Sequence, residues 1–490
     1  MTACLSTRSP QPRPVKDEHD EHGPGIPAPP VPAAADLASA TRADPVLARN
    51  HRLNVLNGSV AIVAINLSVS FYAIYAQRLG ASTTQIALLT ALPAVVMALA
   101  FLPAAAWLEK TFQKRRLIAV VLAITRVLVA TLALVPIFPP VVASWLVVAI
   151  VALDALPGAV ITVGWQSYMG EIFPSNLRAQ LFAVRNWWMG WSGMIAVLVA
   201  GVAIDALPFP LGYQLTFIAS ALAGLVETYF FYALREPAST TQQRASPKRT
   251  RAAVGPETFA PSRLASRLRS VKGEWERLRQ NPAYARFLVA VFLFHVGWMA
   301  LWPVFTVYKL ETLHANNTWM SISVVTSSLG SIFTYRWWSC RSSDRGNHWV
   351  IAVTALALTA VPAAWVAFAR TLTVAALLDG LGGIVVGGFN LAVFNSVLDL
   401  ADANRRATDI AYFNILVQMA GFLSPLAGMY LYNRWGFAAA MLTFATVRAA
   451  GTALLWKLGT YHGKEAAAFR RQHGLGCTAH SSNSDMVLPG

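Results

Sequence analysis

The chain has 490 residues, of which 56% are hydrophobic and 13% are charged, and its mean hydropathy is +0.48. Soluble domains carry about 25% charged residues, so this composition excludes a wholly water-soluble protein. The net charge of +16 does not indicate a nucleic-acid partner, because the basic residues gather in alternate loops between apolar segments.

Twelve apolar segments long enough to cross a bilayer as helices follow one another along the chain. Such segments favour an all-α polytopic membrane protein over a barrel, whose strands would be about ten residues long. Six spans on each side of a central loop predict two pseudo-symmetric six-helix bundles. The predicted spans are 53–77, 84–107, 117–137, 141–168, 182–204, 211–234, 284–309, 317–338, 349–369, 371–397, 410–432 and 437–458.

The sequence divides into five predicted regions. Residues 1–50 and 461–490 are polar tails that we expect to be disordered, because they cannot bury enough apolar surface to fold. Residues 51–234 and 284–460 hold six spans each, and residues 235–283 form a basic connector that contains one amphipathic helix. The bias of basic residues predicts that both tails of this multi-pass protein are cytoplasmic. Alanine-rich composition and the lack of a targeting segment predict a bacterial inner membrane.

One charged, turn-forming stretch occurs twice, after the fourth span of each half. The first copy begins at Glu171 and the second at Asp399. Arg178 in the first copy aligns with Arg406 in the second at the same offset. A spacing that holds across both apolar flanks predicts a duplicated six-span unit.

Ionisable residues inside spans are costly in a bilayer, so each is a functional hypothesis by default. Asp154 lies deep in span 4, and Arg126 lies in span 3 at a depth where the two can pair. A carboxylate that alternates between a proton and an arginine would couple protonation to conformation, whereas a permanent pair would only fix helix packing. Both interpretations stay open. Asp379 occupies the corresponding place in the second half, and Glu227, near the inner end of span 6, is expected to reach the interface.

Other polar residues within the spans are candidate solute ligands. His295 is a candidate proton carrier or ligand donor, with a packing role as the alternative. Arg448 is expected either to bind an anionic solute or to pair with Asp379. Amides from both halves can exchange hydrogen bonds with a polar solute, or else join helices to one another: Asn66, Gln166, Asn390 and Asn414.

The chain resembles the major facilitator superfamily over roughly residues 50–460, with its two six-span halves, long central loop and inside termini. Between spans 2 and 3, the family pattern Gly-x-Leu-Ala-Asp-Arg-x-Gly-Arg-Lys has a loose match. Glu109 keeps the acid, and Lys110 keeps the basic residue after it, while both glycines are replaced. The resemblance implies the twelve-helix fold of this family and a transport function.

The resemblance also implies that loop charges make cytoplasmic contacts that stabilise an outward-open state. Charge pairs at a rocking interface bias a two-state equilibrium. Basic loop residues are equally expected from membrane topology alone. The candidate gate residues are Glu109, Lys114, Arg115, Glu171, Arg178, Asp344, Asp399 and Arg406.

We therefore predict a secondary active transporter that moves a small organic solute by alternating access, with protons as the coupling ion. No enzymatic role, cofactor or metal site is predicted, and the sequence holds no Walker-type phosphate-binding motif. The expected partners are the solute, protons and membrane lipids, for a chain that acts as a monomer. The alternatives are a membrane-embedded sensor or scaffold, with the connector as its output element, and a lipid-processing enzyme.

Overall fold

The computed structural model describes residues 37–111, 113–174, 177–235, 281–400 and 406–473. Over these ranges the chain is helical apart from short connections. The predicted all-α fold is therefore confirmed. The expected amphipathic helix of the connector and most of each expected tail lie outside the described residues.

The first half starts where Asp44 caps a long helix by accepting hydrogen bonds from two backbone N–H groups of the turn that follows. The fourth helix begins in the same way, with a reciprocal capping box between Ser82 and Gln85. The elements of this half are α1 (Leu37–Ala43), α2 (Pro45–Ser68), η1 (Val69–Phe71), α3 (Tyr72–Arg78), α4 (Thr83–Lys110), α5 (Lys114–Thr131), η2 (Leu132–Ile137), α6 (Pro140–Ile172), α7 (Arg178–Ala206) and α8 (Leu211–Tyr232).

The second half repeats this pattern of long helices joined by short turns. Gly436 adopts φ 82°, a conformation that residues with a side chain rarely enter, and it divides the last element into two helical arms. The elements are α11 (Pro282–Met299), α12 (Leu301–Glu311), α13 (Asn317–Arg345), α14 (Asn347–Phe368), α15 (Leu372–Leu400) and α16 (Arg406–His473).

Ten described segments are long and apolar enough to cross a membrane. Helix α13 is not one of them, because serine, threonine and arginine residues lower its hydropathy. The segment Tyr412–Leu458 counts once although the turn at Gly436 splits it into two spans. With α13 included and α16 counted as two, the described helices supply the twelve predicted spans.

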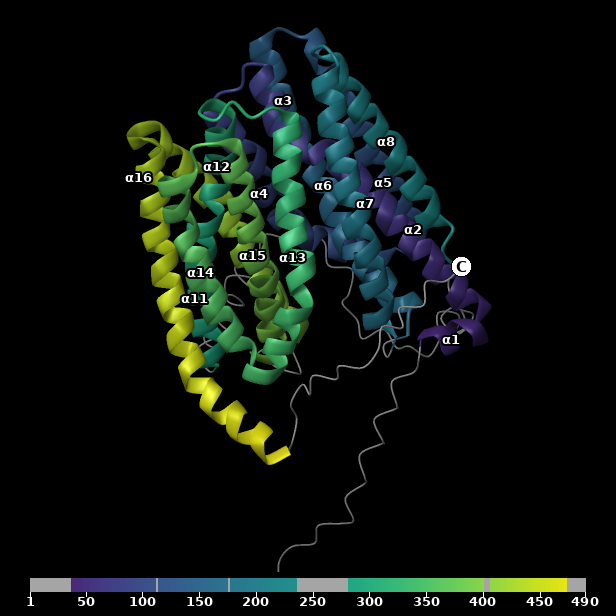
Figure 1. The fold of residues 1–490 in the computed structure, drawn as a ribbon. Coiled ribbons are helices and arrows are strands. Elements are labelled where there is room, and N and C mark those ends of the chain that lie inside the picture. Colours follow the sequence, from purple (N-terminus) through teal and green to yellow (C-terminus); the bar gives the residue numbers. More distant parts are fainter. Residues whose placement is uncertain (1–36, 112, 175–176, 236–280, 401–405, 474–490) are drawn as a thin grey trace, which may run out of the picture.

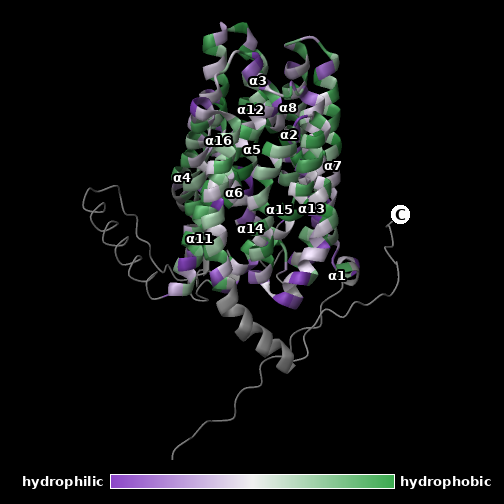
Figure 2. Cartoon of the chain, turned by 60° about the vertical axis from the view of Figure 1, so that its left-hand side comes forward, coloured by the Kyte–Doolittle hydropathy of each residue, from purple (hydrophilic) through white to green (hydrophobic). Residues whose placement is uncertain are grey.

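The two sets of helices lie side by side, with α2 to α8 forming one and α11 to α16 the other (Figure 1). Helix α1 and the last turns of α16 lie at the same end, which we call the tail end, and the opposite end is the distal end. Hydrophobic residues dominate the middle of the bundle, and hydrophilic residues gather toward its ends (Figure 2). Many large apolar side chains on this surface are exposed, including Leu99, Val141 and Phe333, as expected where lipid rather than water covers a protein.

The two copies of the repeated stretch make equivalent contacts. In the first half, Lys114 at the start of α5 donates to Glu171 at the end of α6, with Nζ 2.6 Å from Oε1. In the second half, Asn347 at the start of α14 donates to Asp399 at the end of α15, with Nδ2 2.8 Å from Oδ2. The same joint therefore closes the third and fourth spans of both halves, which supports a duplicated unit.

Two helices extend beyond the predicted limits of the bundles. Helix α2 begins at Pro45 instead of residue 51, and α16 continues to His473 instead of ending at 460. Hydrophobic composition marks the part of a helix that lies in hydrocarbon, whereas a helix that has already formed can continue into polar sequence at little cost.

Candidate functional site

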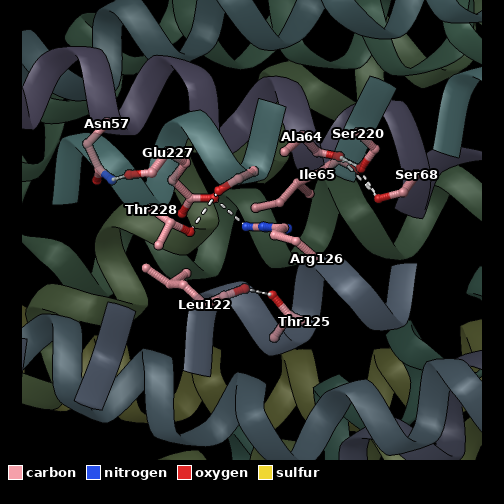
Figure 3. Close-up of polar contacts among 11 residues, drawn as sticks. Asn57, Ala64, Ile65, Ser68, Leu122, Thr125, Arg126, Ser220, Glu227 and Thr228 are labelled. Atoms are coloured by element: carbon pink, nitrogen blue, oxygen red, sulfur yellow. Dashed lines mark hydrogen bonds and ion pairs between the residues drawn. The ribbon is translucent and has the colours of Figure 1, made fainter. Parts of the chain in front are cut away.

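A buried ion pair joins α5 and α8 in the interior of the first half (Figure 3). Arg126 donates through Nη2 to Oε2 of Glu227, and the two residues are only 8% and 6% exposed. Gly224 leaves room for the guanidinium, since a Cβ there would lie 2.0 Å from Arg126 Cδ. Asn57 of α2 donates through Nδ2 to the backbone carbonyl of Glu227 at 3.0 Å. Because loss of either charge would leave the other uncompensated, the pair fixes these helices relative to one another.

Asp154 of α6 does not form the predicted ion pair with Arg126. Its Oδ1 is buried and accepts no hydrogen bond from any described residue, although Asp154 lies within electrostatic range of Arg126 and Tyr72. Arg126 bonds to Glu227 instead, because α5 packs against both α6 and α8, and the position of an arginine along its span does not say which neighbouring helix it faces. The expectation that Glu227 reaches the interface is wrong for the same reason, since Glu227 faces α5.

Arg185 of α7 adds a fourth charge. It lies within electrostatic range of Glu227, and its Cζ lies 4.6 Å from the centre of the Trp165 ring. Asp154, Arg126, Glu227 and Arg185 thus form a series of alternating charges on four helices. We call these four residues the charge array. The sequence had singled out the first two members, but it gave no sign that Glu227 and Arg185 belong with them.

The second half distributes its charges differently. Lys309 of α12 donates to Asp379 of α15, with Nζ 2.6 Å from Oδ2, so the proposed pairing of Arg448 with Asp379 is wrong. Arg448 instead donates to the backbone carbonyls of Leu358 at 2.6 Å and Gly297 at 3.2 Å. These two carbonyls belong to helices on either side of it, which makes Arg448 a cross-link between helices.

The remaining polar candidates within the spans do not converge on one point. His295 is buried, and its Nδ1 lies 2.8 Å from the carbonyl of Val291, one turn earlier on α11. Asn66 of α2 donates to the carbonyl of Gly193 on α7 at 2.9 Å, which is an interhelical contact. The side chains of the other amide candidates are exposed, and they remain candidates for a solute-lining role: Gln166, Asn390 and Asn414.

Five of the gate candidates, Lys114, Arg115, Glu171, Arg178 and Asp399, make hydrogen bonds within their own halves. Besides the Lys114–Glu171 and Asn347–Asp399 joints, Arg178 donates through Nη2 to the carbonyls of Gly170 and Phe173 at 2.9 and 3.0 Å, which closes the turn between α6 and α7. Arg115 donates to the carbonyl of Leu234 at 2.8 Å. Asp344 is exposed, and the side chains of Glu109 and Arg406 lie outside the described residues.

A cluster around Asp205 joins the two halves at the distal end. Asp205 ends α7 and accepts four hydrogen bonds from the start of α13, where Asn317 donates at 3.2 Å (N) and 2.8 Å (Nδ2) and Thr318 donates at 2.7 Å through both N and Oγ1. Tyr213 of α8 donates its hydroxyl to Oδ1 of Asn317 at 2.8 Å. The carboxylate of one half thus caps a helix of the other. The sequence did not predict this cluster. Its signal there was an aspartate at the end of one apolar run and an Asn-Asn-Thr stretch at the start of another.

The family model for the Major Facilitator Superfamily matches residues 55–378 and 287–482, which together make up most of the chain. The chain belongs to the Major Facilitator Superfamily. It is an integral multi-pass membrane protein of a family of transporters, not of enzymes. No curated protein sequence matches the chain.

Solved structures of the superfamily share the fold at low sequence identity. The nucleoside transporter NupG matches with a TM-score of 0.60 at 12% identity, over 84% of this chain and 98% of its own. A D-xylose–proton symporter matches with a TM-score of 0.59 at 11% identity, over 84% and 97%. The human organic anion transporter MFSD10 matches with a TM-score of 0.54 at 14% identity, over 83% and 99%. At these identities the likeness establishes the fold, and not the solute.

Proposed function

We propose that this superfamily member is a proton-coupled secondary transporter that moves a small organic solute by alternating access between its two six-helix halves. The observation that carries the proposal is the environment of Asp154. Its Oδ1 is buried within α6 and accepts no hydrogen bond from a described residue, while the arginine beside it is bonded to Glu227. A carboxylate in this position can exchange a proton without dismantling an ion pair.

The charge array provides a way for protonation of Asp154 to affect the surrounding helices. An ionised carboxylate inside a bilayer is costly unless a cation compensates it, and protonation removes that cost. Arg126 interacts with Asp154 and bonds to Glu227, so the charge on Asp154 changes the balance of forces across α5, α6 and α8. Protonation would thereby favour one arrangement of these helices over another.

The Asp205 cluster supports the proposal of alternating access. Its hydrogen bonds join α7 of the first half to α13 of the second, so the halves are closed together at the distal end. Rocking of the halves would break these bonds and open that end. The closed distal end therefore corresponds to one of the two arrangements between which the transporter would alternate.

A pH-resolved ligand screen followed by uptake tests the proposal. The purified protein is screened by thermal unfolding against sugars, nucleosides, organic acids, peptides and drugs at one acidic and one alkaline pH, because a ligand of the folded state raises its stability by mass action. For a site coupled to one proton, we expect apparent affinity to change by up to about tenfold per pH unit in the wild type. Each stabilising compound is then tested for uptake into proteoliposomes with an inwardly directed proton gradient.

The decisive variant is Asp154→Asn. It should bind the same compound with no pH dependence and should lose gradient-driven uptake. Glu311→Gln, which removes an exposed carboxylate at the distal end, should behave as the wild type. Binding that is independent of pH, together with uptake that survives Asp154→Asn, would leave facilitated transport and contradict proton coupling.

A further inference from the structure

Arg185, the member of the charge array on α7, has a hydrogen-bond donor that is not used. Arg185 Nε is buried without a hydrogen-bond partner, and no carboxylate of a described residue forms a salt bridge with this arginine. Trp165, whose ring lies beneath the guanidinium, also has a buried Nε1–H that donates to no described acceptor. Two donors from α6 and α7 thus lie side by side without an acceptor. Buried polar groups are normally bonded, so each needs an explanation.

Helix α2 carries a third unpartnered group on the face against which Arg185 packs. Asn54 is 0% exposed, and neither its Nδ2 nor its Oδ1 bonds to a described residue. It lies four residues before Gly58, on the same helix face. A Cβ on Gly58 would be 2.6 Å from Arg185 Nε and 2.9 Å from its Cζ, so the guanidinium lies directly over this glycine. The face of α2 that carries Asn54 is therefore the face on which Arg185 packs.

The internal repeat indicates that Arg185 has a role beyond the shared fold. The repeat aligns Asn186 with Asn414, which places Phe413 at the position equivalent to Arg185. Phe413 packs against the apolar core of its own half. Because the duplicated helix is built with an apolar residue in one copy, the architecture itself does not require a cation at this position.

We propose that the transported solute is an organic anion, and that its carboxylate or phosphate group binds to Arg185, Trp165 and Asn54. This inference rests on the proposed transport function. A guanidinium holds either oxyanion through paired, charge-assisted hydrogen bonds, and the indole and amide N–H groups add two further donors. The Oδ1 of Asn54 is the one acceptor of the group, so it favours an anion that also carries a hydroxyl or amide donor.

The charge balance of the array links this site to the proton. With both carboxylates ionised, the two acids and two arginines of the array cancel. Protonation of Asp154 leaves one uncompensated positive charge, and an anion at Arg185 restores neutrality. Uptake of one proton together with one negative charge of the solute would therefore keep the interior of the first half neutral, where an unbalanced charge is costly.

A matched-pair binding experiment tests the anion site. Thermal unfolding of the full-length purified protein is measured with lactate and lactamide, succinate and succinamide, benzoate and benzamide, phenyl phosphate and phenol, and inorganic phosphate. At least one carboxylate or phosphate should raise the unfolding midpoint while its neutral counterpart does not. Stabilisation by carboxylates would identify an organic acid, and stabilisation by phenyl phosphate would identify a phosphate ester. Stabilisation by inorganic phosphate alone would overturn the assignment to an organic anion.

Variants decide whether the anion binds at this site. Arg185→Gln should weaken anion binding by about tenfold to a hundredfold, because that is the typical loss of affinity when hydrogen bonds to a charged group are removed. Gly58→Ala should weaken binding by displacing the guanidinium, and Arg185→Lys keeps the charge if Arg185→Gln fails to fold. Arg116→Gln removes an exposed positive charge from α5 and should leave affinity unchanged.

Three results would overturn the inference. A neutral counterpart could stabilise the protein as much as its anion does, or no anion of the panel could stabilise it. The third is an anion affinity of Arg185→Gln within twofold of that of the wild type. The transport proposal fails independently. Gradient-driven uptake of a neutral solute would refute the anion site and leave proton coupling intact. Anion binding without gradient-driven uptake would refute proton-coupled transport and leave the anion site intact.

Discussion

The two halves of this transporter share one architecture but differ in the charges buried within it. The first half holds the charge array, with a hydrogen-bonded pair at its centre and an arginine without a salt bridge among the described residues. The second half holds the Lys309–Asp379 pair and an arginine bonded to backbone carbonyls. The joint between the third and fourth spans is nevertheless the same in both. Duplication thus explains the backbone, whereas the interior chemistry is specific to each half, and we propose that the first half binds the solute and the proton.

The largest effect should come from removing the acid at the centre of the array. Glu227→Ala leaves Arg126 buried without the acid to which it is hydrogen-bonded, which is expected to lower the free energy of unfolding by about 3–5 kcal/mol. Equilibrium unfolding of the purified variant in detergent measures the change. The double variant Arg126→Met with Glu227→Leu removes both charges and should recover most of the loss. A double variant as unstable as the single one would show that the pair itself, and not the stranded charge, dominates stability.

A pair of glycine variants tests the same pair without altering any charge. The new Cβ of Gly224→Ala would lie 2.0 Å from Arg126 Cδ and force the side chain to move. Overpacking of this kind costs about 1–3 kcal/mol of unfolding free energy. Gly158→Ala, in the same half, meets nothing within 4 Å, so it should be neutral or slightly stabilising. Equal unfolding midpoints for the two variants would contradict the tight packing of Arg126 against α8.

The smallest effect is expected in the second half. The side chain of Asp379 is 20% exposed, against 8% for that of Glu227, so water screens this pair more than the pair in the first half. Asp379→Asn should therefore cost about 1 kcal/mol of unfolding free energy, well below the cost of Glu227→Ala. In this variant Lys309 would still have the aromatic ring of Trp365, whose centre lies 5.3 Å from Nζ, as a partner for its charge. A loss as large as that of Glu227→Ala would mean that the two halves depend equally on buried charge.

The sequence by itself determined the membrane fold of this protein. Length and hydropathy predicted the spans, although the polar residues of α13 keep it less apolar than the other membrane-crossing helices. The repeat that aligns Glu171 with Asp399 predicted two related halves, and the structure gives both residues equivalent partners. These properties follow from a local rule, because a helix must be long and apolar enough to cross hydrocarbon wherever its neighbours lie.

Only the tertiary structure decided which charges meet. The position of Arg126 in its span gives its depth in the membrane. At that depth two acids lie within reach, Asp154 on one neighbouring helix and Glu227 on another, and the sequence does not choose between them. The direction in which a side chain points is readable in soluble helices from their polar and apolar faces. In a bilayer the lipid-facing and the protein-facing sides are both apolar, so that signal is lost. The pairing of Arg126, the cap that Asp205 places on α13 and the unpartnered groups around Arg185 were therefore settled by helix rotation and packing.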